Sequence, residues 1–266
     1  MRPLEPPLGA SWTVEALVGQ ADDLRGSDSA VVAFDAPIGL PRSFLAAAGT
    51  ETFMGWMEEA CLDPARFSPV ATAPEWTVTH PFFRVEKGTG GLGRFVRAAA
   101  RAGVELRREV EQQTGAKSVF ALGIPGQVGP AAQALWCEIS EARRHGWAFA
   151  VWPFETSLPG AGVVVAEIYP RAAYGVALAQ RLPAPPRWLA KTKPAVRVQA
   201  LDELVSSDWI GSLSVRLSGL EHALGSENDF DALVTAAAVL RLVLDERPLA
   251  TSERVDPVAE GGILCV

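Results

Sequence analysis

The sequence contains little cysteine, and its cysteines form no grouping that would constrain the fold. Its 266 residues include three, Cys61, Cys137 and Cys265, which lie far apart along the chain. This spacing excludes a zinc ribbon, a C-x-x-C redox motif and a disulfide framework. We therefore expect a protein of a reducing compartment that folds without disulfides or a structural metal.

Long apolar runs are absent as well. Residues 1–10 contain three prolines and no apolar core of signal-peptide length. The longest apolar stretch, residues 233–244, contains Arg241 and is too short to span a bilayer. We expect a cytoplasmic protein that has no membrane partner.

An excess of positive charge is also lacking. Lys and Arg number 24 and Asp and Glu number 31, which gives a formal net charge of -7. This balance counts against a protein that coats long nucleic acid by charge alone. It leaves open a small acidic site that holds a divalent metal ion.

Several motifs of common enzymes are missing. His80, His145 and His222 are isolated, and none has the spacing of a metal site. No G-x-S-x-G nucleophile elbow occurs. The glycine-rich residues 88–93 (GTGGLG) lack the G-K-[ST] ending of a phosphate loop. The missing nucleophile elbow counts against a serine hydrolase. The missing phosphate loop makes an enzyme that transfers a phosphoryl group from a nucleotide the third hypothesis, after the two functions given below.

Apolar runs and turn residues predict a single α/β domain. Short runs rich in β-branched residues predict buried strands at 29–34, 147–152 and 163–169, and residues 261–265 predict a short terminal strand. Helical periodicity and capping residues predict helices at about 13–24, 130–145, 171–180, 192–206, 208–224 and 228–246. Residues 43–60 are also predicted to be helical, with an interruption at Gly49, and residues 92–114 to form one or two helices. Residues 61–128 are predicted to form an insertion or lid within this domain, and the alternative is a second domain.

Three acidic residues lie in otherwise apolar segments. Asp35 ends one predicted strand, Glu167 lies near the end of another, and Asp231 falls in the first turn of an apolar helix. A carboxylate in such a segment is costly to bury unless it is paired or binds a metal. Three carboxylates that converge at one end of a sheet would suit Mg²⁺ or Mn²⁺. Two such ions can cleave a phosphodiester.

Each acid also has a structural alternative. Asp35 precedes Ala-Pro and could begin an Asx turn, and Glu167 could pair with Arg171 four residues later. Asp231 could interact with the dipole of its helix. The nearby Asp229 fits the last position of an S-x-x-D capping box. The combination of the three acids is what favours a metal site.

Several short motifs occur in a recognisable order. They are FDAPIGLP (34–41), WPFE (152–155), AEIYPRA (166–172), KTKPAVR (191–197), NDFDALVTA (228–236) and EGGIL (260–264). Together they resemble the family catalogued as domain of unknown function 429, from about residue 12 to the C-terminus. The resemblance implies a ribonuclease H-like fold, with a mixed sheet flanked by helices, and a predicted nuclease activity.

The resemblance also implies roles for individual residues. Asp35 matches the acid of the family's D-x-P-x-G-L-P motif, Glu167 that of its E-x-Y-P motif, and Asp231 the last acid of its D-x-x-D-A helix motif. Ribonuclease H-like nucleases hold two metal ions with such acids on adjacent strands and a C-terminal helix. The implied ligands of Mg²⁺ or Mn²⁺ are therefore Asp35, Glu167 and Asp231, with Asn228 as a further oxygen donor.

Two features depart from the family pattern. Such folds begin with a central strand that carries an Asp, and no acid-bearing strand precedes Ser11 here. The chain is then either shortened or lacks a core strand and a metal ligand. An unpaired edge beside the strand that ends at Asp35 would favour a homodimer. In addition, Asn228 replaces the first acid of the helix motif and supplies no charge.

Two functions follow from these observations. The first is a divalent-metal-dependent nuclease or phosphodiesterase, which acts on a nucleic acid or another phosphodiester. The alternative is a catalytically degenerate binding or assembly module of the same fold. The basic residues that could meet a phosphate, or could be ordinary solvated charges, are Arg42, Arg171, Lys191, Lys193 and Arg197.

Overall fold

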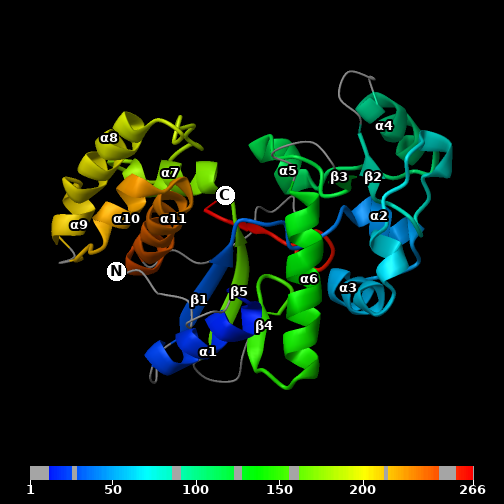
Figure 1. Cartoon of the computed structure of the whole chain (residues 1–266), viewed down its shortest axis with the longest axis horizontal. Helices are drawn as coiled ribbons and strands as arrows, with labels where there is room; N and C mark the ends of the chain where they lie inside the picture. The colour runs from blue at the N-terminus through cyan, green and yellow to red at the C-terminus, as the bar shows by residue number, and fades with distance from the viewer. Residues whose placement is uncertain are drawn as a thin grey trace. The chain divides into compact units, whose positions relative to one another are not determined.

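The computed structural model describes residues 12–25, 29–85, 91–122, 128–155, 162–212, 215–245 and 256–265. Within these residues the chain is a mixed α/β protein with 11 α-helices and a small parallel sheet (Figure 1). The chain divides into two compact units. The larger unit comprises the described residues of Trp12–Glu167 and Thr251–Gly262, and the smaller unit those of Ile168–Ala250 and Ile263–Val266.

The sheet of the larger unit follows the order β1-β5-β4. Its strands are β1 (Ala30–Phe34), β4 (Phe149–Val151) and β5 (Val163–Ile168). Both neighbouring pairs are parallel, and β1 is aligned with β5 from Ala30 opposite Val163 to Phe34 opposite Glu167. Because β5 lies between two strands, its residues are largely buried, as the run of valines predicts. The predicted strands at 29–34, 147–152 and 163–169 are therefore confirmed.

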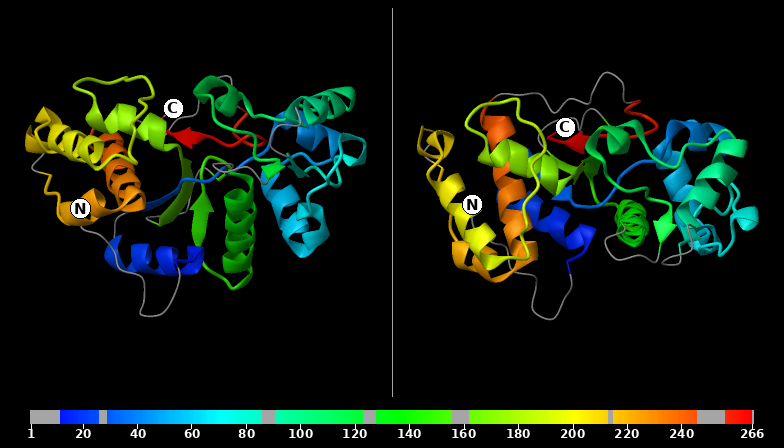
Figure 2. Two further views of the ribbon diagram at one scale, coloured as in Figure 1. Left: turned by 45° about the horizontal axis from the view of Figure 1, so that its top comes forward. Right: turned by 90° about the horizontal axis from the view of Figure 1, so that it is seen from above.

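Two helices pack together beside this sheet. They are α1 (Val14–Arg25), which contacts β1, and α6 (Gly129–Arg144), which contacts α1 (Figure 2). The apolar side chains of Val14 and Val18 are fully buried. A carboxylate oxygen of Glu138 on α6 accepts a hydrogen bond from the Val14 amide at 2.9 Å. This bond caps the start of α1, where a helix has unsatisfied N–H groups.

The described residues between 61 and 128 contribute to the core of the larger unit. The elements around this core are α2 (Arg42–Ala47), α3 (Phe53–Leu62), η1 (Pro64–Phe67), η2 (Ala73–Glu75), β2 (Phe83–Arg84), α4 (Gly91–Arg101), α5 (Glu109–Thr114) and β3 (Ala121–Leu122). Phe82 and Phe120 join the same buried cluster as Phe44 and Trp136. The ring of Phe82 lies 5.7 Å from Phe120 and 6.3 Å from Trp136. The described residues of this segment therefore contribute to the core of the unit, and their role as an insertion or lid stays a prediction.

Two long segments that the sequence predicts to be helical each contain two helices. The interruption predicted at Gly49 is confirmed, because its φ of 72° ends α2 in the left-handed region. The chain then enters α3 with a new cap, because the hydroxyl of Thr52 accepts a hydrogen bond from the Gly55 amide at 3.2 Å. Of the two alternatives for residues 92–114, the structure has two helices, α4 and α5, and Gly103 between them has a φ of 71°.

The smaller unit is mostly helical. Its elements are α7 (Pro170–Leu178), α8 (Pro194–Val205), α9 (Asp208–Ser212), α10 (Leu220–Gly225), α11 (Glu227–Leu244) and β6 (Ile263–Leu264). Helix α11 packs against α7 and α10. The helix expected at 208–224 is two helices here, and residues 213–214 lie outside the described residues. In the described part of the chain, no helix has both the length and the apolar character needed to cross a bilayer.

Candidate functional site

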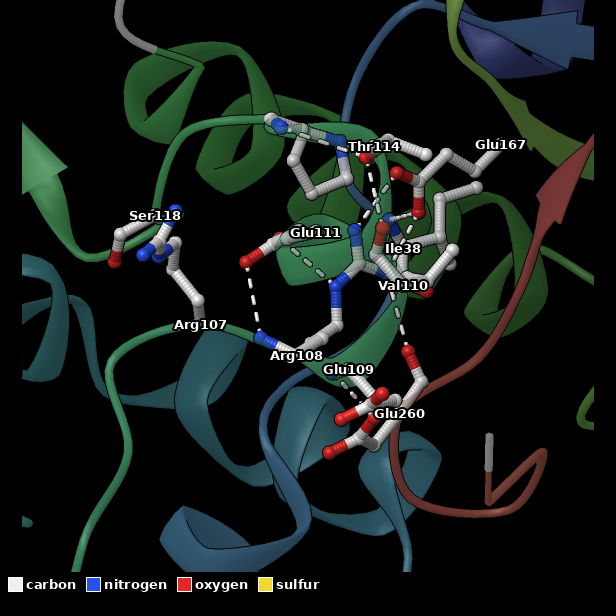
Figure 3. A network of polar contacts seen from close by, with 12 residues as sticks. Ile38, Arg107, Arg108, Glu109, Val110, Glu111, Thr114, Ser118, Glu167 and Glu260 are labelled. Atoms are coloured by element: carbon white, nitrogen blue, oxygen red, sulfur yellow. Dashed lines mark hydrogen bonds and ion pairs between the residues drawn. The ribbon is translucent and has the colours of Figure 1, made fainter. Parts of the chain in front are cut away.

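The buried side chain of Arg108 connects segments that are distant in the sequence (Figure 3). Arg108 lies directly before α5 and has no solvent exposure. Its two terminal nitrogens bind both oxygens of Glu167, with Nη1 to Oε2 and Nη2 to Oε1 each at 2.7 Å. This is a bidentate ion pair, the strongest geometry that an arginine and a carboxylate can form.

The same ion pair holds the loop that follows β1. The Ile38 amide donates to Oε2 of Glu167 at 2.7 Å, while Nη1 of Arg108 donates to the Ile38 carbonyl at 3.2 Å. Nη1 also donates to the Glu260 carbonyl at 3.1 Å. Arg108 therefore joins residues of the D-x-P-x-G-L-P, E-x-Y-P and EGGIL motifs at one point.

A second carboxylate, that of Glu111, completes the network. Nε of Arg108 donates to Glu111 Oε1 at 2.9 Å, and the Arg108 amide donates to Glu111 Oε2 at 3.1 Å. Burial would lower the pKa of Arg108, but the Glu167 and Glu111 carboxylates raise it above its ordinary value. Burial raises the pKa of Glu111 to about 7, with a further increase from Glu167, although Arg108 opposes the shift. The network thus places two carboxylates on one guanidinium.

The carboxylate of Glu260 caps two helices. It accepts from the Arg42 amide at the start of α2 at 3.1 Å and from the Glu109 amide at the start of α5 at 2.8 Å. Negative charge is favourable at both helix N-termini. Gly39 permits this packing, since a Cβ there would lie 2.1 Å from the Glu260 carbonyl oxygen, at a φ of 142°. Glu260, the first residue of the EGGIL segment, therefore packs against the loop after β1.

Asp35 is exposed at the end of β1. It follows Phe34, which pairs with Glu167 in the parallel register. The structure therefore brings Asp35 and Glu167 to the same edge of the sheet, as the sequence predicts. Their surroundings differ: Glu167 is 4% exposed and bound to Arg108, whereas Asp35 leads into the loop. Pro37 in that loop is tied to α6 through its carbonyl, which accepts from the Trp136 indole at 2.8 Å.

Asp231 and Asn228 belong to the smaller unit. One oxygen of Asp231 accepts from the Tyr174 hydroxyl, and the other contacts the Lys191 ammonium. Asn228 is exposed in the first turn of α11. That these residues share a metal with Asp35 and Glu167 stays a prediction. The capping of α11 is confirmed, because the hydroxyl of Ser226 accepts from the amide of residue 229 at 3.3 Å.

The predicted phosphate-binding residues have different environments. Arg42 has a 75% exposed side chain, 3.6 Å from a carboxylate oxygen of Asp256. Lys193 is exposed directly before α8. Arg197 is 5% exposed and donates to backbone carbonyls at the end of α10 and before α8. The Nε of Arg171 is buried, with no hydrogen-bond partner among the described residues. Phosphate binding by these residues stays a prediction.

Sequence reasoning missed Arg108, Glu111 and Glu260. Arg108 stands between Arg107 and Glu109, so the segment resembles a solvated run of charges. A signal was nevertheless present, because Val104, Leu106, Arg108 and Val110 alternate with more polar residues, and all four are buried. An arginine at an apolar position of such an alternation needs a buried carboxylate.

Glu167, as it is bound here, fits the implied metal poorly. The oxygens of Glu167 already accept three hydrogen bonds, two of them from a guanidinium that would repel a cation.

The chain matches no family model, no curated protein and no solved structure.

Proposed function

We propose that the chain is a binding or assembly module of ribonuclease H-like fold. The resemblance of its motifs supports this fold, and so does a parallel sheet that ends at Asp35 and Glu167. The observation that carries the functional proposal is the bidentate ion pair between Glu167 and the fully buried Arg108. It gives the acid of the E-x-Y-P motif a positioning role.

The charge balance around Arg108 explains why Glu167 suits that role better than metal binding. A buried guanidinium without its carboxylate is unfavourable by about 3–5 kcal/mol. A metal ion that drew Glu167 away would therefore have to offset this penalty. It would also release the Ile38 amide, which donates to the same carboxylate. Glu167 instead holds the loop after β1 in one conformation.

The acid of the helix motif is engaged in a similar way. Asp231 is partly buried, and its two oxygens contact the Tyr174 hydroxyl and the Lys191 ammonium. Lys191 supplies the positive charge that the carboxylate requires. Glu167 and Asp231, which the sequence assigns to a metal, thus each have a cationic partner within their own unit.

One observation favours the second candidate, a nuclease or phosphodiesterase that uses Mg²⁺ or Mn²⁺. Asp35 is exposed directly beyond the carboxyl end of β1, beside the end of β5. Ligands of open α/β sheets bind beyond the carboxyl ends of the strands. A carboxylate at this position has the hard oxygens that these ions prefer.

Metal-dependent cleavage separates the two candidates. Single-stranded, duplex, hybrid and branched nucleic acids would be incubated with Mn²⁺ or Mg²⁺ and the wild type, Asp35→Asn or Glu167→Gln. A binding module predicts that the wild type cleaves no faster than Asp35→Asn. Cleavage that is lost in Asp35→Asn, with circular dichroism confirming the fold, would contradict the module. If Glu167→Gln then retained cleavage, the nuclease would use a metal site that excludes Glu167.

A further inference from the structure

Helix α4 carries three exposed arginines on a chain whose formal net charge is -7. They are Arg94, Arg97 and Arg101, which we call the basic stripe. Positions separated by three and four residues lie on the same face of a helix. The stripe therefore concentrates positive charge on one side of α4 in a protein that is otherwise acidic.

The opposite face of α4 fixes the helix to the core. Phe95 is 3% exposed and Ala99 is fully buried. The Phe95 ring stacks on Phe83 of β2, with 4.2 Å between the ring centroids and 10° between the planes. The helix also contacts η2, which precedes β2 in the chain. The stripe is thus presented by an anchored helix.

The stripe has no counterion within the described part of the chain, where no ion pair includes any of its three arginines. Two nearby carboxylates are engaged elsewhere. Glu75 of η2 accepts from the backbone amides at positions 71 and 72, at 3.1 and 3.0 Å. Glu105, which follows α4, accepts from the side chain of Gln112 at 3.4 Å. The positive charge is therefore available to a partner.

We propose that the basic stripe binds the phosphate backbone of a nucleic acid. This inference rests on the proposed binding function and names its partner. Guanidinium groups match phosphate oxygens in a bidentate manner, which favours arginine over lysine for this task. From Arg94 to Arg101 the helix rises roughly 10 Å. That length corresponds to about three nucleotides of one strand at roughly 3.4 Å each.

The arrangement of apolar residues favours a nucleic acid over a membrane. A helix that lies in a membrane interface inserts a continuous apolar face. Phe95 and Ala99, which would form such a face, are buried in the protein. The large apolar side chains that α4 leaves about half exposed are Leu92 and Val96. Two such residues give little area for insertion, whereas three guanidinium groups suit a row of phosphates.

Binding would be measured by fluorescence anisotropy with labelled single-stranded and duplex nucleic acid, in EDTA so that no metal-dependent cleavage occurs. The test variant is Arg94→Gln/Arg97→Gln/Arg101→Gln. The control, Lys117→Gln/Arg144→Gln/Arg181→Gln, loses the same charge at three exposed positions outside α4. Three phosphate contacts on a duplex predict a salt slope near -2.7, which is an affinity loss of about 40-fold between 50 and 200 mM salt. The test variant should lose this slope, and the control should retain it.

Three results would overturn the inference. The first is a wild type that binds no nucleic acid in low salt, and the second is an equal loss of binding in both triple variants. The third is binding to vesicles rich in phosphatidylserine without binding to nucleic acid. A different result would refute the proposed non-catalytic function, namely metal-dependent cleavage that Asp35→Asn abolishes. Cleavage combined with stripe-dependent binding would refute the non-catalytic module and leave the basic stripe as the binding surface.

Discussion

The buried network predicts an unusual pH dependence of stability that Glu111→Gln should remove. Arg108 supplies one positive charge to two buried carboxylates, Glu111 and Glu167. When both are ionised, the network holds one excess negative charge away from water. Burial is the largest cause that raises the pKa of Glu111, from 4.5 to about 7. The folded protein therefore binds this proton more tightly than the unfolded chain does.

The sign of the effect follows from that difference. Between pH 4.5 and about pH 7 the folded state carries more of this proton than the unfolded state. The contribution of Glu111 is fully present below pH 4.5 and is lost as the pH rises through about 7. One pKa unit corresponds to about 1.4 kcal/mol, so the shift from 4.5 to about 7 amounts to roughly 3 kcal/mol. About 2–3 kcal/mol of this contribution to the free energy of unfolding is lost between pH 5 and pH 8.

The variant Glu111→Gln isolates this contribution, because the amide has nearly the same shape and does not titrate. Its side-chain oxygen can still accept from Nε of Arg108, where the carboxylate accepts at 2.9 Å. A constant cost of the substitution cancels when the two proteins are compared at several pH values. The free energy of unfolding of the wild type, relative to the variant, should fall by about 2–3 kcal/mol from pH 5 to pH 8.

Urea denaturation followed by circular dichroism at several pH values measures this difference. A matched control is Glu109→Gln, which makes the same chemical change at a half-buried position of α5. The free energy of unfolding of the wild type, relative to this control, should not fall in the same way from pH 5 to pH 8. If the difference between the wild type and Glu111→Gln stayed constant within about 1 kcal/mol, the excess buried charge inferred from the contacts would be refuted.

Three further predictions test the packing around this network and at the end of the chain. Gly39→Ala should destabilise the protein by about 2–4 kcal/mol in urea denaturation, because its φ is 142° and a Cβ would meet a backbone oxygen at 2.1 Å. The control Gly49→Ala has a φ of 72° with no atom within 4 Å, so it should cost only about 1–2 kcal/mol. Glu260→Gln removes the charge that caps two helix N-termini and should lower the melting temperature, with a cost of about 1–2 kcal/mol. Burial raises the pKa of Cys265 to about 12, so iodoacetamide should label it about a thousandfold more slowly at pH 8 than an ordinary thiol, and urea should remove this protection.

The strands were predictable because their signal is local. Runs such as 30–34 and 163–168 are rich in β-branched residues and end at polar residues, so their type and limits follow from the sequence. The limits of the helices were harder to predict. Gly49 was visible as an interruption, but the new start at Thr52 depends on a hydrogen bond that forms only after the chain has turned. Helix limits of this kind follow from local geometry more than from periodicity.

The site could be predicted only in part, and Glu167 shows why. A carboxylate inside a buried strand requires a cation, and that requirement is readable from the sequence. The identity of the cation is not, since a metal ion and a guanidinium both satisfy the charge. Arg108 lies 59 residues earlier in the chain and also donates to the carbonyls of Ile38 and Glu260. Because one side chain binds an acid and two backbone oxygens together, it fixes the loop after β1 while it neutralises Glu167. An acidic motif alone therefore predicts that a positive partner exists, and the position of the arginine decides whether the acid holds a ligand or holds the fold.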